Sequence, residues 1–286
     1  MADAIPNTDD KADIQRTRAT SLRNLHADGL FVLPNAWDAF SAALIAQAGA
    51  PAIATTSAAV AWSLGHPDGQ RVSREEAVGQ VRRIVAAVDL PVTADIEGGY
   101  GPAPEDVAAT VEAVVAAGAV GVNLEDSTAP GGPLFDRAAQ AARLQAARAA
   151  TVSAGLPELV INARTDVYLF GIGAPEDRFD DVLTRAAAYA AAGADSLFVP
   201  GLLDLETLSD LVGKSPLPIN VMTGPGAPGI SEFAAVGVRR VSVGPALAQA
   251  AYAQAKAAAD ELLEHGTYTA LGAALDFGAV EALFTH

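Results

Sequence analysis

Short apolar runs alternate with longer amphipathic stretches along this chain, and this alternation constrains the fold more than any other feature. The apolar runs are bounded by Gly or Pro and lie at residues 30–33, 52–56, 92–96, 120–124, 159–163, 196–199, 218–222 and 240–243. The stretches with helical periodicity lie near residues 38–49, 74–88, 104–117, 137–154, 177–192, 204–213, 230–236 and 245–264. Strands that alternate with helices of this length form parallel βαβ units.

Eight such units in a chain of 286 residues favour a closed barrel over an open sheet. A doubly wound nucleotide-binding sheet carries a G-x-G-x-x-G turn after its first strand, and this sequence has none there. We therefore predict an α/β protein with one (β/α)₈ TIM-type barrel domain over residues 1–286 and an apolar barrel core. We expect an N-terminal helical segment over about residues 1–28, the barrel over about 30–245 and C-terminal helices over about 245–286. The apolar tail near residues 268–284 is a candidate packing arm for a neighbouring subunit.

The composition argues against several classes of partner and of active site. A net charge of −16 is repelled by the phosphate backbone of nucleic acids and by anionic membrane surfaces. Because the chain has no cysteine, disulfides, thiolate nucleophiles, cysteine-ligated zinc and iron–sulfur clusters are excluded. The first 30 residues lack an apolar signal core, and no run approaches the roughly 18 apolar residues of a membrane span. We therefore expect a cytoplasmic protein that binds neither nucleic acid nor membrane.

Acidic side chains lie at the ends of two neighbouring predicted strands, where barrel enzymes carry their catalytic groups. Asp95 and Glu97 are two residues apart, so in an extended strand both point to the same face, and Glu125 reaches the next strand at the same level. Converging carboxylates repel unless a hard cation neutralises them, and oxygen ligands alone select Mg²⁺ or Mn²⁺. Any one of these acids could equally be a helix cap or a solvated loop residue, but the three together favour a metal site.

One basic residue, Arg164, ends the fifth predicted strand and faces this acidic region. Its guanidinium could bind a substrate carboxylate through two parallel hydrogen bonds. A structural salt bridge from Arg164 to Asp126 or Asp166 is an equally good interpretation. None of the three lysines falls at the end of a predicted strand, so Schiff-base chemistry is not supported.

Five motifs in order resemble the isocitrate lyase and phosphoenolpyruvate mutase superfamily. They are Thr55-Thr56-Ser57, Leu64-Gly65 through Asp68, Asp95-x-Glu97-Gly-x-Tyr-Gly, Asn123-Leu124-Glu125-Asp126 and Ala163-Arg164-Thr165-Asp166. The resemblance implies that Asp95 binds Mg²⁺ most directly, while Asp68, Glu97 and Glu125 hold its water ligands. It also implies that Thr56 and Ser57 bind substrate and take part in catalysis through hydroxyl and backbone N–H groups, that Arg164 clamps a carboxylate, and that Asn123 binds substrate. By the same analogy, the C-terminal helices are swapped between the subunits of a dimer or tetramer.

The sequence also departs from that superfamily after the fourth strand. Lyases of the family carry a Lys-Lys-Cys-Gly-His-like segment there, whose cysteine acts as an acid, whereas residues 127–133 read Ser-Thr-Ala-Pro-Gly-Gly-Pro. Phosphonopyruvate-forming mutases have a lysine and an asparagine in this gating loop and a histidine after strand six, where this chain has Pro200. The Leu-Pro-Asn-Ala-Trp-Asp segment at residues 33–38 resembles a branch suited to 2-oxo acids such as 2-oxoglutarate or oxaloacetate.

We therefore expect a Mg²⁺-dependent lyase or decarboxylase that cleaves a carbon–carbon bond of a small 2-oxo or 2-hydroxy (di)carboxylic acid through a metal-stabilised enolate. The alternatives are a P–C bond mutase or hydrolase acting on a phosphonopyruvate-like substrate, and a non-catalytic 2-oxo acid-binding protein. The loop at residues 127–134 is expected to be mobile without ligand and to close over the site, because its Pro-Gly-Gly core has little side chain to pack. The sequence identifies neither the acid nor the proton donor.

Overall fold

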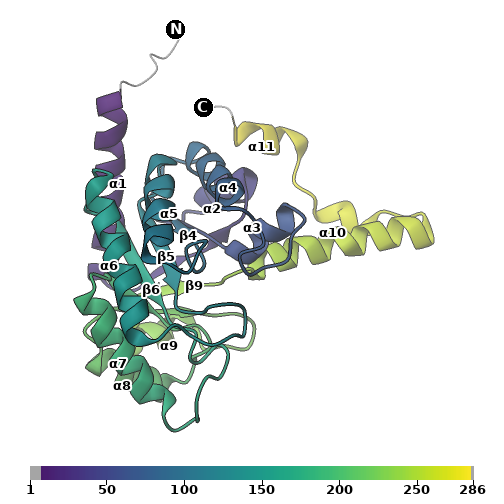
Figure 1. The fold of residues 1–286 in the computed structure, drawn as a ribbon. Helices are drawn as coiled ribbons and strands as arrows, with labels where there is room; N and C mark the ends of the chain where they lie inside the picture. The colour runs from purple at the N-terminus through teal and green to yellow at the C-terminus, as the bar shows by residue number, and fades with distance from the viewer. Residues whose placement is uncertain (1–7, 285–286) are drawn as a thin grey trace.

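Parallel strands form a barrel surrounded by helices in the computed structural model, which describes residues 8–284 (Figure 1). Residues 1–7 of the expected N-terminal segment, and residues 285 and 286, lie outside the described residues. The strands are β1 (Phe31–Leu33), β2 (Asn35–Ala36), β3 (Ile53–Thr55), β4 (Val92–Asp95), β5 (Gly121–Glu125), β6 (Val160–Arg164), β7 (Ser196–Phe198), β8 (Ile219–Met222) and β9 (Arg240–Ser242). Their order in the sheet is β1-β9-β8-β7-β6-β5-β4-β3-β2.

The predicted TIM-type barrel is confirmed, although its first strand is split in two. Only Pro34 separates β1, which pairs with β9, from β2, which pairs with β3. A proline has no backbone N–H to give to a ladder, so the run breaks there. Because the two end strands of the sheet are one stretch of chain, the sheet closes on itself.

The helices follow the predicted alternation. They are α1 (Thr8–Ala27), α2 (Ala39–Gln47), α3 (Ser57–Ser63), α4 (Arg74–Ala86), α5 (Pro104–Ala116), α6 (Arg137–Ser153), α7 (Arg178–Ala191), α8 (Leu205–Lys214), α9 (Ile230–Ala235), α10 (Ala246–His265), the 3₁₀ helix η1 (Thr269–Ala273) and α11 (Phe277–Ala282). The sequence did not predict α3, because seven residues are too few to show a helical period. Of the helices in the described part of the chain, none is both long and apolar enough to cross a membrane.

The expected apolar core is present, but a layer of buried polar side chains interrupts it among the strands. Asn162 lies fully buried between two other asparagines, and its Nδ2 donates to Asn123 Oδ1 at 2.8 Å and to Asn220 Oδ1 at 3.0 Å. Ser196 Oγ donates to Asn162 Oδ1 at 2.7 Å. Buried amides are tolerated when they bond to one another, and periodicity cannot distinguish such a layer from an aliphatic one.

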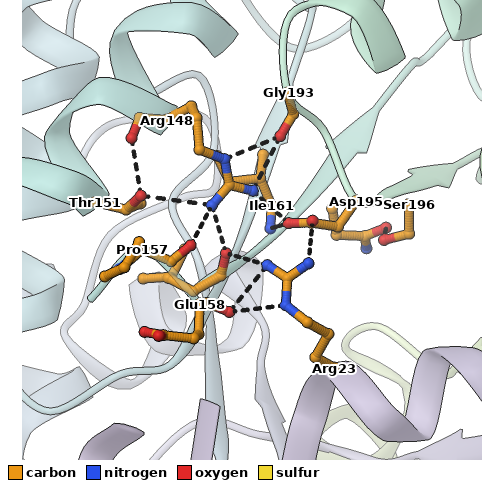
Figure 2. Close-up of polar contacts among 11 residues, drawn as sticks. Arg23, Arg148, Thr151, Pro157, Glu158, Ile161, Gly193, Asp195 and Ser196 are labelled. Atoms are coloured by element: carbon orange, nitrogen blue, oxygen red, sulfur yellow. Dashed lines mark hydrogen bonds and ion pairs between the residues drawn. The ribbon is translucent and has the colours of Figure 1, made fainter. Parts of the chain in front are cut away.

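Polar contacts at the amino-terminal end of the barrel join the N-terminal helix α1 and helix α6 to the strands (Figure 2). The Asp195 carboxylate accepts from Arg23 of α1 at 2.7 Å, from Arg148 of α6 at 2.5 Å and from the Ile161 backbone N–H at 2.8 Å. Both arginines also donate to backbone carbonyls, including that of Leu159. One carboxylate therefore ties α1 and α6 to β6.

The C-terminal helix α10 begins beside the barrel and extends away from it in Figure 1. The C-terminal segment touches the wall through two ring pairs, Tyr252 with Trp37 at 6.1 Å and Phe284 with Phe40 of α2 at 6.0 Å between centroids. Large apolar side chains on these helices are exposed, among them Leu263 at 84%, Phe277 at 78% and Tyr268 at 69%. The wall itself carries an apolar groove of about 880 Å³, which Leu247 from the start of α10 also lines. The other lining residues include Leu30, Val32, Pro34, Trp37, Leu44 and Ile45.

Candidate active site

Asp95 is the last residue of β4, and the start of α3 holds its carboxylate at the mouth of the barrel. Asp95 Oδ2 accepts from the Ser57 backbone N–H at 3.1 Å and from Ser57 Oγ at 2.8 Å. The Asp95 backbone N–H donates to Thr55 Oγ1 at 2.8 Å. The Thr56 N–H donates to the Ala36 carbonyl at 3.2 Å. The backbone N–H groups of Thr56 and Ser57, which were expected to bind substrate, therefore already donate within the protein. The sequence could not indicate that β2 and Asp95 lie within hydrogen-bond distance of them.

Glu97 reaches the mouth by a different route from the predicted one. The strand ends at Asp95, and Glu97 has a left-handed φ of 50°, so the two residues do not share an extended strand face. The turn nevertheless brings the carboxylates together: burial, and then the charge of Asp95, raise the pKa of Glu97 to about 7. The predicted convergence is present, but the turn produces it rather than the strand alternation.

Glu97 is hydrogen-bonded to two residues that were not among the predicted site residues. Its carboxylate accepts from the Gln70 backbone N–H and from Tyr100 Oη, the latter at 3.4 Å, and Gln70 Oε1 accepts from the Tyr100 N–H at 2.9 Å. Within the described chain, these three are the non-glycine residues with positive φ. Strained backbone of this kind clusters at functional sites. Tyr100 stood inside a recognised motif, but nothing in the sequence marked Gln70, which lies in a loop far from Glu97 along the chain.

The other two predicted acids join the same cluster. Burial, and then the charge of Asp95, raise the pKa of Asp68. Burial raises the pKa of Glu125, at the end of β5, well above its usual range; Arg164 opposes the shift, while Asp166 and Asp95 add to it. Carboxylates whose charges act on one another in this way share one region of low polarity. The structure thus gathers all four predicted acids at the mouth.

Arg164, at the end of β6, already binds two carboxylates of the protein. Its Nη1 lies 3.0 Å from Glu125 Oε2, and its Nε donates to Asp166 Oδ1 at 2.6 Å. Of the two structural partners considered, Asp166 is therefore correct and Asp126 is wrong. Asp126 accepts instead from Arg185 and Tyr189 of α7, at 3.1 and 2.7 Å, because that helix covers the outer side of the strand ends. Arg164 Nη2 takes part in neither pair.

A second cation, Arg240, lies beneath the mouth and was also missed. It is 1% exposed, and its Nη2 donates to Asn123 Oδ1 at 3.2 Å. Among the described residues, its Nε and Nη1 have no hydrogen-bond partner. Burial lowers the pKa of Arg240 to about 9, against the charge of Asp95. Because Arg240 begins a strand, a search of strand ends could not find it; it also binds the side chain of Asn123, the predicted substrate ligand.

The residues at the mouth fit a hydrated Mg²⁺. The groups in the cluster that could bind a metal are carboxylates, and carboxylate oxygen is the ligand type that this ion prefers. Over residues 8–284, however, no group of three or more Asp, Glu or His side chains is arranged so that it could hold a metal ion by itself. Mg²⁺ commonly keeps several waters and takes only one or two carboxylates directly. A Mg²⁺ ion at the mouth would therefore have to be bound through one or two carboxylates and its own waters.

The expected gating loop is a short hairpin over this site. Ser127 pairs with Leu134 across its base, and Ser127 Oγ donates to Asp166 Oδ2 at 2.6 Å. At its tip, Pro130 packs so closely on Gly69 that a Cβ on that glycine would lie 2.2 Å from Pro130 Cγ. The loop thus meets the segment that carries Asp68. Its mobility without ligand stays a prediction.

The chain matches the family model of phosphoenolpyruvate phosphomutase over residues 22–263. An oxaloacetate decarboxylase of Rhodopseudomonas palustris is 32% identical over 236 residues, which are 80% of this chain and 78% of that protein. A Burkholderia cenocepacia crystal structure, assigned to the lyase/mutase class, is 39% identical with a TM-score of 0.88 over 95% of this chain and 98% of that one. Oxaloacetate acetylhydrolase in complex with the product oxalate is 26% identical, with a TM-score of 0.84 over 94% of both chains. The family match spans every strand end described above.

Proposed function

The chain belongs to the phosphoenolpyruvate phosphomutase family, an enzyme family of lyases and mutases, and on that premise we propose that it is a Mg²⁺-dependent carbon–carbon lyase or decarboxylase. Its substrate is a small 2-oxo or 2-hydroxy (di)carboxylic acid, and the cleaved bond leaves an enolate. The observation that carries this proposal is the cluster of Asp68, Asp95, Glu97 and Glu125 beside Arg164. The oxaloacetate chemistry of two similar proteins supports the choice of substrate class.

The residues of the mouth would act mainly by positioning. When bound, Mg²⁺ would supply positive charge next to the oxygens on which negative charge develops. Asp95 would hold the ion, with its orientation fixed by Ser57, while Asp68, Glu97 and Glu125 would bind the ion's waters. Manganese would satisfy the same oxygen donors. Since the chain has no cysteine, the proton that the enolate takes up would come from water or from a hydroxyl group.

Substrate recognition in this proposal rests on a smaller set of donors than the sequence predicted. The Thr56 and Ser57 side chains remain candidates, but their backbone N–H groups bond within the protein. Arg164 would bind a carboxylate through Nη2, or by exchanging its bond to Glu125 for one to substrate. Asn123 would contribute through its Nδ2, because its Oδ1 accepts from Asn162 and Arg240.

A metal-dependent thermal-shift screen, followed by turnover assays, tests the proposal. Oxaloacetate and related 2-oxo and 2-hydroxy acids should raise the melting temperature in the presence of Mg²⁺ and be consumed, since a ligand that binds only the folded state stabilises it. Asp95→Ala should abolish both effects while keeping the fold. Turnover of phosphonopyruvate alone would favour P–C bond chemistry instead, and tight binding of an acid without turnover would favour a binding protein.

We also propose that the C-terminal helices are swapped between subunits of a dimer or tetramer. The apolar groove on the wall beside β1 and the exposed apolar side chains of α10 and α11 support this arrangement. A single subunit leaves both surfaces in water, which is unfavourable for patches of this size. The single-domain organisation and the cytoplasmic location stay predictions.

A further inference from the structure

The turn that carries Glu97 has a backbone that few sequences tolerate. Glu97, Gly99 and Tyr100 have φ values of 50°, 87° and 57°, so three of four consecutive residues are left-handed. Each non-glycine residue in that region costs on the order of 1–3 kcal/mol, and such a conformation persists only when surrounding contacts impose it. The contacts of this turn therefore determine where the Glu97 carboxylate lies.

Every carbonyl of the turn, from residue 97 to residue 102, accepts a hydrogen bond from outside it. Three of these bonds come from three separate elements: the Glu125 N–H to Glu97 at 3.0 Å, Thr110 Oγ1 to Gly99 at 2.7 Å, and Arg74 Nη2 to Tyr100 at 3.4 Å. The other three all come from Arg143 of α6. Its Nη2 donates to Gly98, and its Nη1 donates to Gly101 at 2.9 Å and to Pro102 at 2.6 Å.

Arg143 is a buried cation whose terminal guanidinium nitrogens donate to the carbonyls of this turn. It is 1% exposed, its guanidinium lies 4.2 Å from the centre of the Phe135 ring, and among the described residues it forms no ion pair, although the charge of Asp106 acts on it from farther away. Its Nε donates to Gln140 Oε1 at 3.0 Å, and Gln140 Nε2 donates to the Glu125 carbonyl at 3.1 Å. Burying an arginine without a counter-charge is unfavourable unless its donors are used. Through these bonds α6 joins the Glu97 turn to the end of β5.

We propose that Arg143 is a positioning residue of the metal site, which holds the Glu97 turn so that its carboxylate faces Asp95 before any ion binds. The identity of the ion rests on the proposed function, whereas the effect on the turn does not. A planar guanidinium can bridge three carbonyls at fixed angles, and a lysine ammonium cannot. Partners at this distance from an ion commonly change metal affinity by about 10- to 100-fold when they are removed.

The chain offers a matched control on the same helix. Arg148 also donates to backbone carbonyls, those of Gly193, Pro157 and Leu159, but it does so at the opposite end of the barrel (Figure 2). Arg143→Met and Arg148→Met each remove a carbonyl-binding arginine from α6. Only the first removes it from the mouth.

The experiment combines hydrogen–deuterium exchange of the metal-free protein with calorimetric titration of Mg²⁺ alone. Arg143→Met should speed exchange across residues 97–102 and raise the Mg²⁺ dissociation constant by about 10-fold or more. Arg148→Met should lower the melting temperature and leave both readings within about twofold of the unchanged protein. Arg143→Lys should give intermediate values, because it keeps the charge but loses the fork.

Unchanged exchange of the turn in Arg143→Met would overturn the proposal, as would equal loss of Mg²⁺ affinity in the Arg148 variant. If Arg143→Met does not fold, Arg143→Lys decides, and exchange at the rate of the unchanged protein in that variant overturns the proposal. If the unchanged protein binds no Mg²⁺, the proposed function fails. The exchange measurement still tests the turn in that case.

Discussion

At the scale of single residues, Arg164 has two candidate roles, substrate binding and a structural ion pair, and the structure shows the ion pairs. It pairs with Glu125 and Asp166, so a bond to the proposed substrate would have to use Nη2 or replace one of these partners. Although burial lowers the pKa of its guanidinium, the neighbouring carboxylates Glu125 and Asp166 raise it further, so the group stays charged. Its charge is therefore constant, and only its geometry can distinguish substrate binding from a structural role.

Arg164→Lys tests that geometry, because it keeps the charge and removes the fork. If Arg164 clamps substrate, ligand affinity should fall by about 10- to 100-fold, equivalent to one or two charge-assisted hydrogen bonds. If the residue serves only Glu125 and Asp166, the melting temperature should fall while the affinity of the folded protein is unchanged. Calorimetric titration and thermal unfolding of one preparation separate these results.

His26 illustrates a different effect of burial at this scale. Burial, followed by the charge of Arg240, lowers its pKa from 6.5 to about 4, so it is neutral when folded. Because the unfolded chain binds a proton at higher pH than the folded one, this site favours folding fully above about pH 6.5 and loses that contribution as pH falls towards 4. The expected loss is about 2 to 3 kcal/mol between pH 7 and 4.5.

Urea unfolding of the unchanged protein and of His26→Gln at these two pH values isolates the effect. Other groups titrate in both proteins, so the difference between them reports His26 alone. The variant should lose less stability on acidification. Equal losses would show that the pKa of His26 is the same in the folded and unfolded states, and would contradict the shift.

At the scale of elements, the contact between the two mouth loops predicts how the hairpin at residues 127–134 is held. Gly69→Ala should displace the hairpin, because the new Cβ would lie 2.2 Å from Pro130 Cγ. Gly65→Ala is the control: that residue lies in the same loop and is also left-handed, at 81°, but has no atom within 4 Å of its Cβ position. Both changes carry the backbone strain, and only one carries the clash.

Hydrogen–deuterium exchange across residues 127–134 distinguishes the two variants. We expect faster exchange and lower turnover in Gly69→Ala, and exchange like that of the unchanged protein in Gly65→Ala. Similar behaviour of both variants would assign the effect to strain in the segment that carries Asp68. The packing of the loops would then have no part in closing the site.

At the scale of the whole molecule, the exposed C-terminal helices predict an oligomer. Leu263 of α10 and Phe277 of α11 are 84% and 78% exposed. Light scattering should give the mass of a dimer or tetramer for the unchanged protein. The double variant Leu263→Asp, Phe277→Asp should give a smaller mass, because charged groups are unfavourable in an apolar interface core. A monomeric unchanged protein at micromolar concentration would contradict the swapped arrangement.

The sequence by itself determined the alternation of strands and helices, the closed barrel and the place of Asp95 and Glu125 at strand ends. These follow from local rules, since apolar periodicity, caps and the carboxyl ends of parallel strands all act within a few residues of chain. The position of Asp95 and Glu125 was predictable for that reason. For Thr56 and Ser57, the sequence identified the hydroxyl side chains at the end of a strand. It could not predict the hydrogen-bond partners of their backbone N–H groups.

Only the tertiary structure decided which groups meet. The left-handed turn at Glu97, the buried Arg240 and the Arg143 bonds depend on contacts between segments that lie tens of residues apart in the sequence. A strand pattern indicates a face, but the partner of a polar atom is whichever group the closed barrel brings within about 3 Å, and burial then makes that pairing obligatory. Sequence periodicity carries no information on that distance, so the residue types at the mouth were predictable while their geometry was set by the packing of the barrel.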